Sequence, residues 1–289
     1  MVYLVAITIL WAFSFSLIGV YLAGQVDAYF SVLTRVALAT VVFLPFIRRV
    51  PIVLAAKLML LGAIQLGCMY VFYYQSFLLL TVPEVLIFTI LTPIYVTLVF
   101  DVMQRRFSLR YLVTAIVAVL GAAIIRYSSI GSDVFSGFLV VQGANICFAI
   151  GQVGYKVLLE RQNLKLPQRA IFGYFYLGAL VVTVVTWFLF GNPAKLPTTA
   201  LQWEILLYLG LIASGLGYFF WNKGATKVDA GTLAIMNNAL VPAGLIVNLI
   251  IWNRDANLLR LFLGGTVLLF SLLLHEYWGK RRTLKTQII

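Results

Sequence analysis

The chain has 289 residues, of which 63% are hydrophobic and 10% charged, with a formal net charge of +12. A mean hydropathy of +1.02 excludes a water-soluble protein, because a soluble core could not bury so much apolar surface. At about 20 apolar residues per crossing, this length accommodates about ten membrane-spanning helices and leaves no room for a soluble catalytic domain.

In chain order, continuous apolar runs predict ten transmembrane helices, because only segments with all backbone hydrogen bonds satisfied can cross a bilayer. The expected spans are residues 2–22, 29–47, 54–76, 83–101, 110–127, 134–156, 170–190, 203–223, 230–251 and 258–278. The first span is expected to be a retained helix, because it is too long for a signal peptide and no basic segment precedes it. The sequence therefore predicts an all-α integral membrane protein.

The basic residues predict the orientation of these helices. Of the 21 Lys and Arg, sixteen fall at one side of the membrane, four at the other, and Arg35 lies within a span. Because short basic loops resist translocation, both termini are expected in the cytoplasm of a bacterial cell, with 279–289 as a basic cytoplasmic tail. This topology accounts for the net charge, so we expect contact with membrane lipids and not with nucleic acid.

The ten spans divide into two halves of five, residues 1–127 and 134–278. Pro93 lies in the fourth span, and Pro242 lies 149 residues later in the ninth, within the similar segments Leu-Thr-Pro and Leu-Val-Pro. Because each half has an odd number of spans, the second must enter the membrane from the opposite side. The pattern predicts two inverted five-helix repeats, typical of secondary transporters, with helix kinks at the two prolines.

Few residues are suited to metal or redox chemistry. His275 is the single histidine, and Cys68 and Cys147 lie 79 residues apart within apolar runs. A site of Cys and His ligands lacks enough members, so no metal and no cofactor are expected. A phosphate-binding Gly-rich loop ending in Gly-Lys-Ser/Thr is also missing, which excludes ATP hydrolysis by this chain.

Two charged residues at membrane depth are candidates for function. Arg35 lies about 10 Å into the second span, where a guanidinium could bind a substrate carboxylate through two hydrogen bonds. Alternatively, it caps helix carbonyls or reaches the interface and holds the bundle together. Glu84, at the start of the fourth span, is a candidate for proton coupling. It could equally pair with Arg35 or stabilise the positive end of its own helix.

Uncharged polar residues, spread over several spans, are expected to line a path near the membrane midplane with aromatic side chains beside it. Amides offer a donor and an acceptor together, which suits a urea or amide group of a ligand. For any single residue, hydrogen bonding between helices is the alternative. The candidate substrate-binding residues are the polar Ser14, Gln65, Asn145, Asn237 and Asn238 and the aromatic Trp11, Tyr70, Tyr74 and Tyr155.

Several segments carry a resemblance to a known family. They are Leu10-Trp11-Ala12-Phe13-Ser14-Phe15-Ser16, Tyr21-Leu22-Ala23-Gly24, Leu91-Thr92-Pro93, Val153-Gly154-Tyr155-Lys156 and Val228 through Asn238. With the ten spans and the two prolines, they resemble the EamA type of the drug/metabolite transporter superfamily over almost the whole chain. The resemblance is strongest to inner-membrane members that carry biotin, and it implies a ten-helix secondary transporter with uptake of biotin.

Biotin also suits the candidate residues. Its ureido ring requires amides, its thiophane ring requires aromatic and aliphatic walls, and its carboxylate requires a cation, which could be Arg35 or Lys156. The resemblance implies alternating access about a midplane site, driven by an ion gradient or by trapping of the substrate. Because both repeats lie in one chain, a monomer could suffice.

Three alternative functions differ from biotin uptake. The same fold would support an exporter of amino acids, amphipathic metabolites or drugs, because function depends on the site and not on the fold. An enzyme acting on lipid would need paired carboxylates, a metal cluster or a nucleophile with a base, whereas the nine Asp and Glu are dispersed. A structural membrane protein would not need a polar midplane path. The sequence thus predicts a transporter and not an enzyme.

Overall fold

A computed structural model describes residues 1–105, 134–162 and 166–252, with scattered residues between 107 and 120 and between 263 and 277. Within these residues all regular secondary structure is helical and no strand occurs, as expected for an all-α protein. The expected spans 110–127 and 258–278 lie largely outside the described residues, and the tail 279–289 lies wholly outside them.

Eight helical segments are long and apolar enough to cross a membrane, and they correspond to eight of the ten expected spans. They are Val2–Leu22, Ala28–Phe46, Ile52–Leu79, Glu84–Gln104, Phe135–Arg161, Arg169–Phe190, Ala200–Ala225 and Ala230–Val247. Of these eight, the third and the seventh extend beyond both of their expected ends, and the fifth extends to Arg161, beyond its expected end at residue 156. In the seventh, Thr199 and Gln202 form a capping box, so the helix starts in a polar segment that hydropathy alone does not include.

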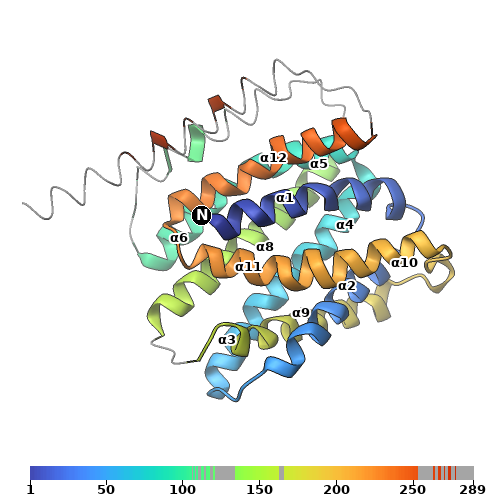
Figure 1. Cartoon of the computed structure of the whole chain (residues 1–289), viewed down its shortest axis with the longest axis horizontal. Helices are drawn as coiled ribbons and strands as arrows, with labels where there is room; N and C mark the ends of the chain where they lie inside the picture. The colour runs from blue at the N-terminus through green and yellow to red at the C-terminus, as the bar shows by residue number, and fades with distance from the viewer. Residues whose placement is uncertain are drawn as a thin grey trace, which may run out of the picture.

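The α-helices lie side by side in a bundle (Figure 1). They are α1 (Val2–Leu17), α2 (Ala28–Phe43), α3 (Ile52–Gly62), α4 (Met69–Leu79), α5 (Val82–Phe88), α6 (Thr92–Gln104), α8 (Val134–Arg161), α9 (Arg169–Phe190), α10 (Ala200–Leu207), α11 (Gly217–Ala225) and α12 (Ala230–Trp252). One π segment (Ile18–Leu22) ends the first span, and 3-10 turns lie at Leu44–Phe46, Thr89–Leu91 and Pro193–Lys195.

Two of the spans share an unusual construction, in which a π-helical middle joins two α-helices. Ala63–Cys68 joins α3 to α4, and Tyr208–Leu216 joins α10 to α11. Segments of π-helix are rare and occur often at functional sites, because the wider turn shifts the register of the side chains that follow.

The two prolines occupy different local structures. Pro93 lies in the first turn of α6, directly after the 3-10 turn Thr89–Leu91 that separates α5 from α6. Because proline has no N–H, the carbonyl of Thr89 lacks its α-helical donor, and the backbone N–H and the hydroxyl of Thr92 donate to it instead, the hydroxyl at 2.6 Å. Pro242 lies inside α12, which continues as α-helix on both sides of it.

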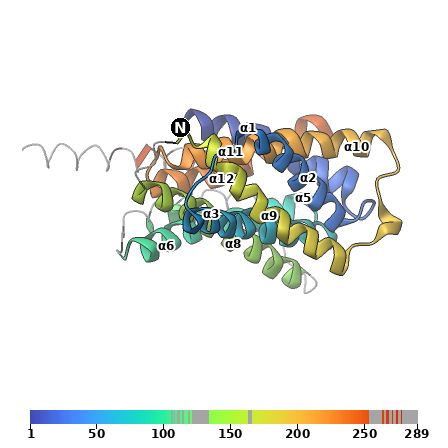
Figure 2. The same ribbon diagram turned by 90° about the horizontal axis from the view of Figure 1, so that it is seen from below.

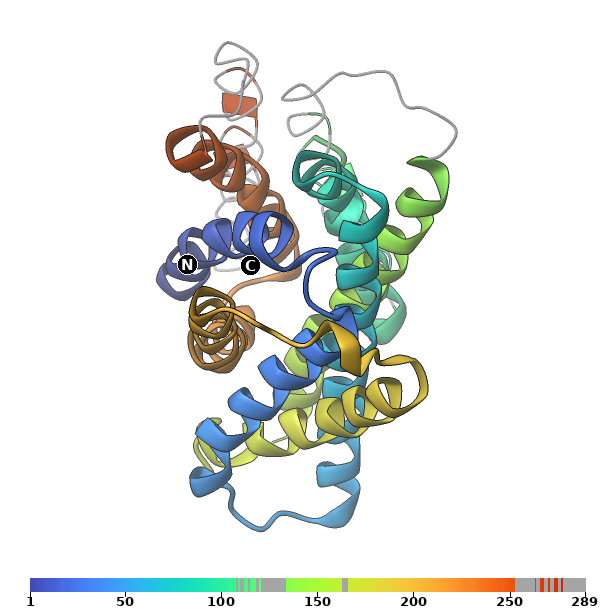
Figure 3. The same cartoon turned by 90° about the vertical axis from the view of Figure 1, so that its right-hand side faces the viewer.

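The helices form two groups that meet directly where α12 packs against α6, with α2 and α9 packed against each other beside them. In the first group α1 packs against α11 and α12, and in the second α8 packs against α4 and α6. Figure 3 shows the N-terminal helix (dark blue) beside the orange and red-orange helices, with the cyan and green helices across the bundle. Between α3 and α9 the backbones lie in close contact, because a Cβ at Gly62 would overlap the carbonyl oxygen of Phe175.

Loop hydrogen bonds join neighbouring helices at both ends of the bundle. At the end that holds the N-terminus, which we call the basic end because Arg48, Lys57 and Arg161 also lie there, Arg48 N donates to the carbonyl of Ala170 at 2.9 Å. Figure 2 shows the connection from α9 to α10 at the opposite end. There, Asp27 N donates to the carbonyl of Lys195 at 2.7 Å.

Candidate functional site

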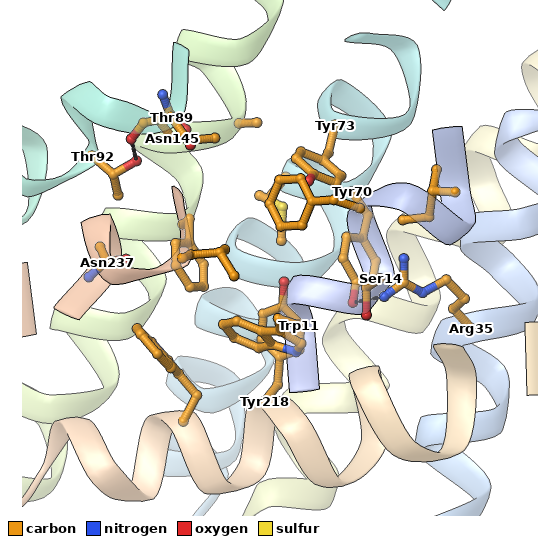
Figure 4. A pocket seen from close by; sticks show the side chains of 17 residues that line it. Trp11, Ser14, Arg35, Tyr70, Tyr73, Thr89, Thr92, Asn145, Tyr218 and Asn237 are labelled. Atoms are coloured by element: carbon orange, nitrogen blue, oxygen red, sulfur yellow. Dashed lines mark hydrogen bonds between the residues drawn. The ribbon is translucent and has the colours of Figure 1, made fainter. Parts of the chain in front are cut away.

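A cavity in the middle of the bundle brings together residues of both helix groups, α2 and the break between α5 and α6 (Figure 4). It holds about 710 Å³ of space not filled by protein atoms, including the part that is open to solvent. Its lining consists of Trp11, Ser14, Phe15, Ile18, Arg35, Met69, Tyr70, Tyr73, Thr89, Thr92, Ala144, Asn145, Phe148, Tyr218, Trp221, Asn237 and Leu240.

One end of the cavity holds Arg35, whose side chain is 3% exposed. Its Nε donates to Ser214 Oγ at 3.1 Å, and its terminal nitrogens donate to Tyr70 OH at 2.7 Å and Tyr74 OH at 3.2 Å. The guanidinium carbon also lies 4.3 Å from the centre of the Tyr70 ring. Tyr70 OH and Ser214 Oγ are themselves 2.8 Å apart, so a hydrogen-bonded network fixes the cation at this end.

The charge of Arg35 has no carboxylate among these partners. A guanidinium has five N–H donors, and the three hydrogen bonds to hydroxyl groups leave two of them available. A buried cation is costly unless an anion or several hydrogen bonds compensate it. This end of the cavity is therefore suited to an anionic group with two oxygen atoms.

Glu84 does not supply that anion, since both of its hydrogen bonds come from Thr81, the residue directly before α5. Its Oε2 accepts from the backbone N and from Oγ1 of Thr81, both at 2.8 Å. The carboxylate thus caps the first turn of α5, which is one of the alternatives that the sequence left open.

The opposite end of the cavity is lined by amides and hydroxyls (Figure 4). Asn145 Nδ2 donates to the carbonyl of Phe88 at 2.9 Å and to Gln142 Oε1 at 3.1 Å. Gln142 Nε2 donates to the same carbonyl at 3.1 Å. Amides of α8 thus bond to the last residue of α5, directly before the 3-10 turn, and this end of the cavity is neutral and rich in hydrogen-bonding groups.

A second amide network joins α8, α11 and α12 beneath the cavity. Gln152, which is fully buried, accepts from Trp221 Nε1 at 2.9 Å and donates to Asn237 Oδ1 at 3.2 Å. Trp221 and Asn237 line the cavity, whereas Gln152 does not. Gln152 therefore holds an aromatic and an amide lining residue in place from behind.

Aromatic rings occupy the space between the two ends. Trp11 lies 4.7 Å from Tyr218 and 5.0 Å from Trp221, measured between ring centroids. Its Nε1 donates to the carbonyl of Ala213 at 2.8 Å, within the π segment Tyr208–Leu216. Figure 4 shows Trp11, Tyr70, Tyr73 and Tyr218 between Arg35 and Asn237. These rings offer apolar walls to a ligand that is polar at both ends.

Two hydroxyl groups of the lining have no hydrogen-bond partner within the described part of the chain. Ser14 Oγ and Tyr73 OH are both buried, and their residues are 5% and 9% exposed. An unsatisfied buried hydroxyl costs about 1–3 kcal/mol, so a ligand that bonds to either one regains that cost on binding.

Six of the eleven residues expected to bind substrate line this cavity: Trp11, Ser14, Arg35, Tyr70, Asn145 and Asn237. The other five do not line it. Among these, Tyr74 bonds to Arg35 from behind, and the side chains of Gln65 and Asn238 are fully buried without a hydrogen-bond partner among the described residues.

Lys156 and Tyr155 lie on α8, beyond Gln152 toward the basic end. Lys156 Nζ donates to the carbonyl of Val228 at 2.6 Å and forms an ion pair with Glu160 at 2.6 Å. Tyr155 packs edge-on against Phe172, with ring centroids 5.3 Å apart. In this conformation Lys156 already has an anionic partner and does not reach the cavity.

Tyr73, Thr89 and Thr92 were not among the eleven substrate-binding candidates, but they belong to the polar and aromatic residues expected along the midplane path, and they line the cavity. Thr89 and Thr92 lie around the helix break that precedes Pro93. The prediction missed Trp221, which lies three residues after Tyr218 and shares its helix face. In the described part of the chain, no three His, Cys, Asp or Glu side chains come together as metal ligands.

Comparisons with known proteins place these features in a family. The profile of the EamA-like transporter family matches residues 135–277. The probable biotin transporter of Pseudomonas aeruginosa is 57% identical over 272 residues, which cover 93% of this chain and 95% of that protein. The biotin transporters of Escherichia coli K12 and Salmonella typhimurium are 52% and 53% identical over 289 residues, covering 99% of this chain and 96% of each relative.

A solved crystal structure shares the fold. It superposes with a TM-score of 0.76 over 96% of this chain and 98% of its own, at 14% sequence identity. At that identity the similarity concerns the arrangement of the helices alone.

Proposed function

This chain belongs to the EamA-like transporter family, and from that premise we propose that it carries biotin into the bacterial cell. It is a multi-pass membrane protein and a transporter, not an enzyme. The observation that carries the proposal is the cavity with a cation at one end, amides at the other and aromatic rings between them. Biotin has the complementary order of groups: a carboxylate, a carbon chain with a thiophane ring, and a ureido ring.

In this proposal the carboxylate of biotin binds to Arg35. The two N–H donors that remain on the guanidinium match the two oxygen atoms of a carboxylate, and the charge of the pair is neutralised inside the membrane. Lys156 is the weaker candidate for this role, because it lies outside the cavity and bonds to Glu160 and Val228.

The ureido ring binds at the amide end of the same cavity. Asn145 and Asn237 lie at this end, where their side-chain amides, as donors and acceptors, match the N–H and C=O groups of a urea. Ser14 and Tyr73 have hydroxyl groups free for further hydrogen bonds with the substrate. Trp11, Tyr70 and Tyr218 form the walls around the thiophane ring and the carbon chain.

The mechanism that we propose is alternating access between two inverted repeats. If the two halves correspond span by span, the first, eighth and ninth of the ten expected spans match the sixth, third and fourth. The first helix group (α1, α11, α12) then corresponds to the second (α8, α4, α6). The same exchange matches the two π-centred spans with each other. The family profile covers residues 135–277, nearly the range expected for the second repeat. These correspondences support two repeats that rock about a shared site.

On the basic side of the cavity, two sets of hydrogen bonds join α8 to the first helix group. Gln152 ties α8 to Trp221 of α11 and Asn237 of α12, and one turn further Lys156 bonds to the carbonyl of Val228 before α12. A substrate that leaves through this end requires α8 to separate from α11 and α12. From the positive-inside rule we infer that this end, and with it the N-terminus, faces the cytoplasm.

Glu84 is the coupling candidate. Its carboxylate accepts both hydrogen bonds from Thr81, so protonation would weaken the cap of α5, whose other end leads to the lining residues Thr89 and Thr92. Proton coupling would then act through the helix break and not through direct contact with substrate.

The test is uptake of radiolabelled biotin by a bacterial strain that cannot synthesise it, with and without this gene. We expect saturable uptake that depends on the gene and that ends when a protonophore collapses the proton gradient. Uptake that persists with the protonophore would contradict the coupling role of Glu84, but it would not contradict transport of biotin. Absence of uptake, together with raised resistance to amino-acid analogues, would contradict biotin import and indicate an exporter.

A further inference from the structure

A second hollow lies at the basic end, on the outer side of α8 and away from the central cavity. Lys57 of α3, Arg105 at the end of α6 and Arg161 at the end of α8 line it, and its described lining includes no Asp or Glu. We propose that this hollow binds the phosphate of an anionic phospholipid headgroup.

The position of Lys57 gives the first argument. Val53 and Leu60 lie on the same face of α3 and are 62% and 61% exposed to the outside of the bundle, where lipid chains lie. Lys57 is exposed between them, about 8 Å along the axis from the first residue of α3. Within the described residues no carboxylate forms an ion pair with Lys57 or Arg105. An ammonium on a lipid-facing side at this depth requires an anionic partner, which the membrane itself supplies.

The second argument is the arrangement of the hollow between three spans. Arg161 donates to the carbonyl of Met103 at 2.7 Å, so its guanidinium is fixed where α8 and α6 meet. Leu60 and Leu61 continue the lining as apolar surface. Three cations beside an apolar surface that faces lipid match an anionic headgroup with its acyl chains, and basic pockets between transmembrane helices on the cytoplasmic side bind such headgroups.

The geometry of α8 distinguishes this hollow from the substrate path. Asn145 and Gln152 lie on the face of α8 that is directed toward the cavity and α12. Gly154 and Arg161 line the hollow, and Gly154 is two residues, or about 200° of helix rotation, away from Gln152. The hollow is thus separated from the cavity by the body of α8, which favours a lipid over biotin as its occupant.

The test uses the full chain, purified and incubated with vesicles of equal parts phosphatidylcholine and phosphatidylglycerol, and counts retained lipids by native mass spectrometry. We expect the wild type to retain phosphatidylglycerol preferentially. Because each cation contributes about 1 kcal/mol, Lys57→Gln and Arg105→Gln should each lower the preference about fivefold. Lys57→Arg keeps the charge and should keep the preference, which separates loss of charge from loss of folding.

Lys227→Gln is the matched control, because it removes an exposed cation at the same end of the bundle outside the hollow. It should leave the lipid preference unchanged. Equal retention of both lipids by the wild type, or an equal loss in Lys227→Gln and Lys57→Gln, would overturn the proposal. Displacement of phosphatidylglycerol by inorganic phosphate would identify a site for soluble anions instead, and displacement by biotin would identify a substrate vestibule.

Discussion

The two ends of the central cavity differ in how their polar groups are held. At the Arg35 end a charged group is surrounded by hydroxyls and has donors left over. At the amide end, Asn145 and Asn237 are already bonded to a backbone carbonyl and to neighbouring amides. A ligand therefore gains a new charge-assisted interaction at the first end, but must share existing hydrogen bonds at the second. We expect the Arg35 end to contribute more to affinity, and the amide end to contribute more to selectivity.

The largest effect is expected from Arg35→Ala, which removes the cation. Loss of a charge-assisted hydrogen-bonded pair should weaken biotin binding on the order of a hundredfold. Equilibrium binding of radiolabelled biotin to purified protein measures this change. Arg35→Lys keeps the charge but not the paired geometry, and it should restore only part of the affinity.

Comparing biotin with its methyl ester distinguishes binding of the carboxylate by Arg35 from a purely structural role of Arg35. Biotin methyl ester lacks the carboxylate charge, so it should bind the wild type weakly and bind Arg35→Ala no worse. If Arg35→Ala weakened the acid and the ester by the same factor, Arg35 would act only through the network with Tyr70 and Ser214.

A smaller effect is expected from Asn237→Ala at the amide end. This change removes one hydrogen-bonding group and should weaken binding of biotin about tenfold, with the same factor for the methyl ester. Asn238→Ala is the matched control, because Asn238 is the adjacent residue, is also buried and does not line the cavity. Equal losses in the two variants would show that helix packing, not ligand contact, explains the result.

A still smaller effect is expected from Tyr73→Phe, which removes one of the two unpartnered hydroxyls of the lining. If the substrate bonds to this hydroxyl, binding should weaken about fivefold. Tyr155→Phe removes another unpartnered buried hydroxyl, but one that lies outside the cavity, and it should leave affinity unchanged. Isothermal titration of both variants measures the difference, and unchanged affinity in Tyr73→Phe would exclude this contact.

Much of the fold could be predicted from the sequence because the membrane imposes it. Hydropathy located eight helices that the structure describes, since every backbone group inside lipid must bond within a helix. The π segments at Ala63–Cys68 and Tyr208–Leu216 could not be predicted in this way, because a hydropathy average does not register a change of helical pitch.

The candidate site could be predicted in part. Arg35 and Asn145 were found because polar residues inside a membrane are costly, which makes each one conspicuous in an apolar span. The same criterion cannot tell which face of a helix a residue occupies, so Asn238 and Lys156 were grouped with cavity residues that lie on other faces or at other depths. Trp221 and Phe148 were missed because aromatic residues are common in every span.

The smallest effect on affinity is expected from Lys156→Gln, the alternative cation. Lys156 lies beyond Gln152 and bonds to Val228 and Glu160, so its loss should change the KM for biotin less than twofold. It should nevertheless alter the maximal rate, because the variant weakens the contact that holds α8 to the segment before α12. Kinetics of uptake separate the two quantities. A large rise in KM with an unchanged maximal rate would indicate that Lys156, and not Arg35, binds the carboxylate of biotin. It would contradict the larger contribution to affinity that we assign to the Arg35 end of the cavity.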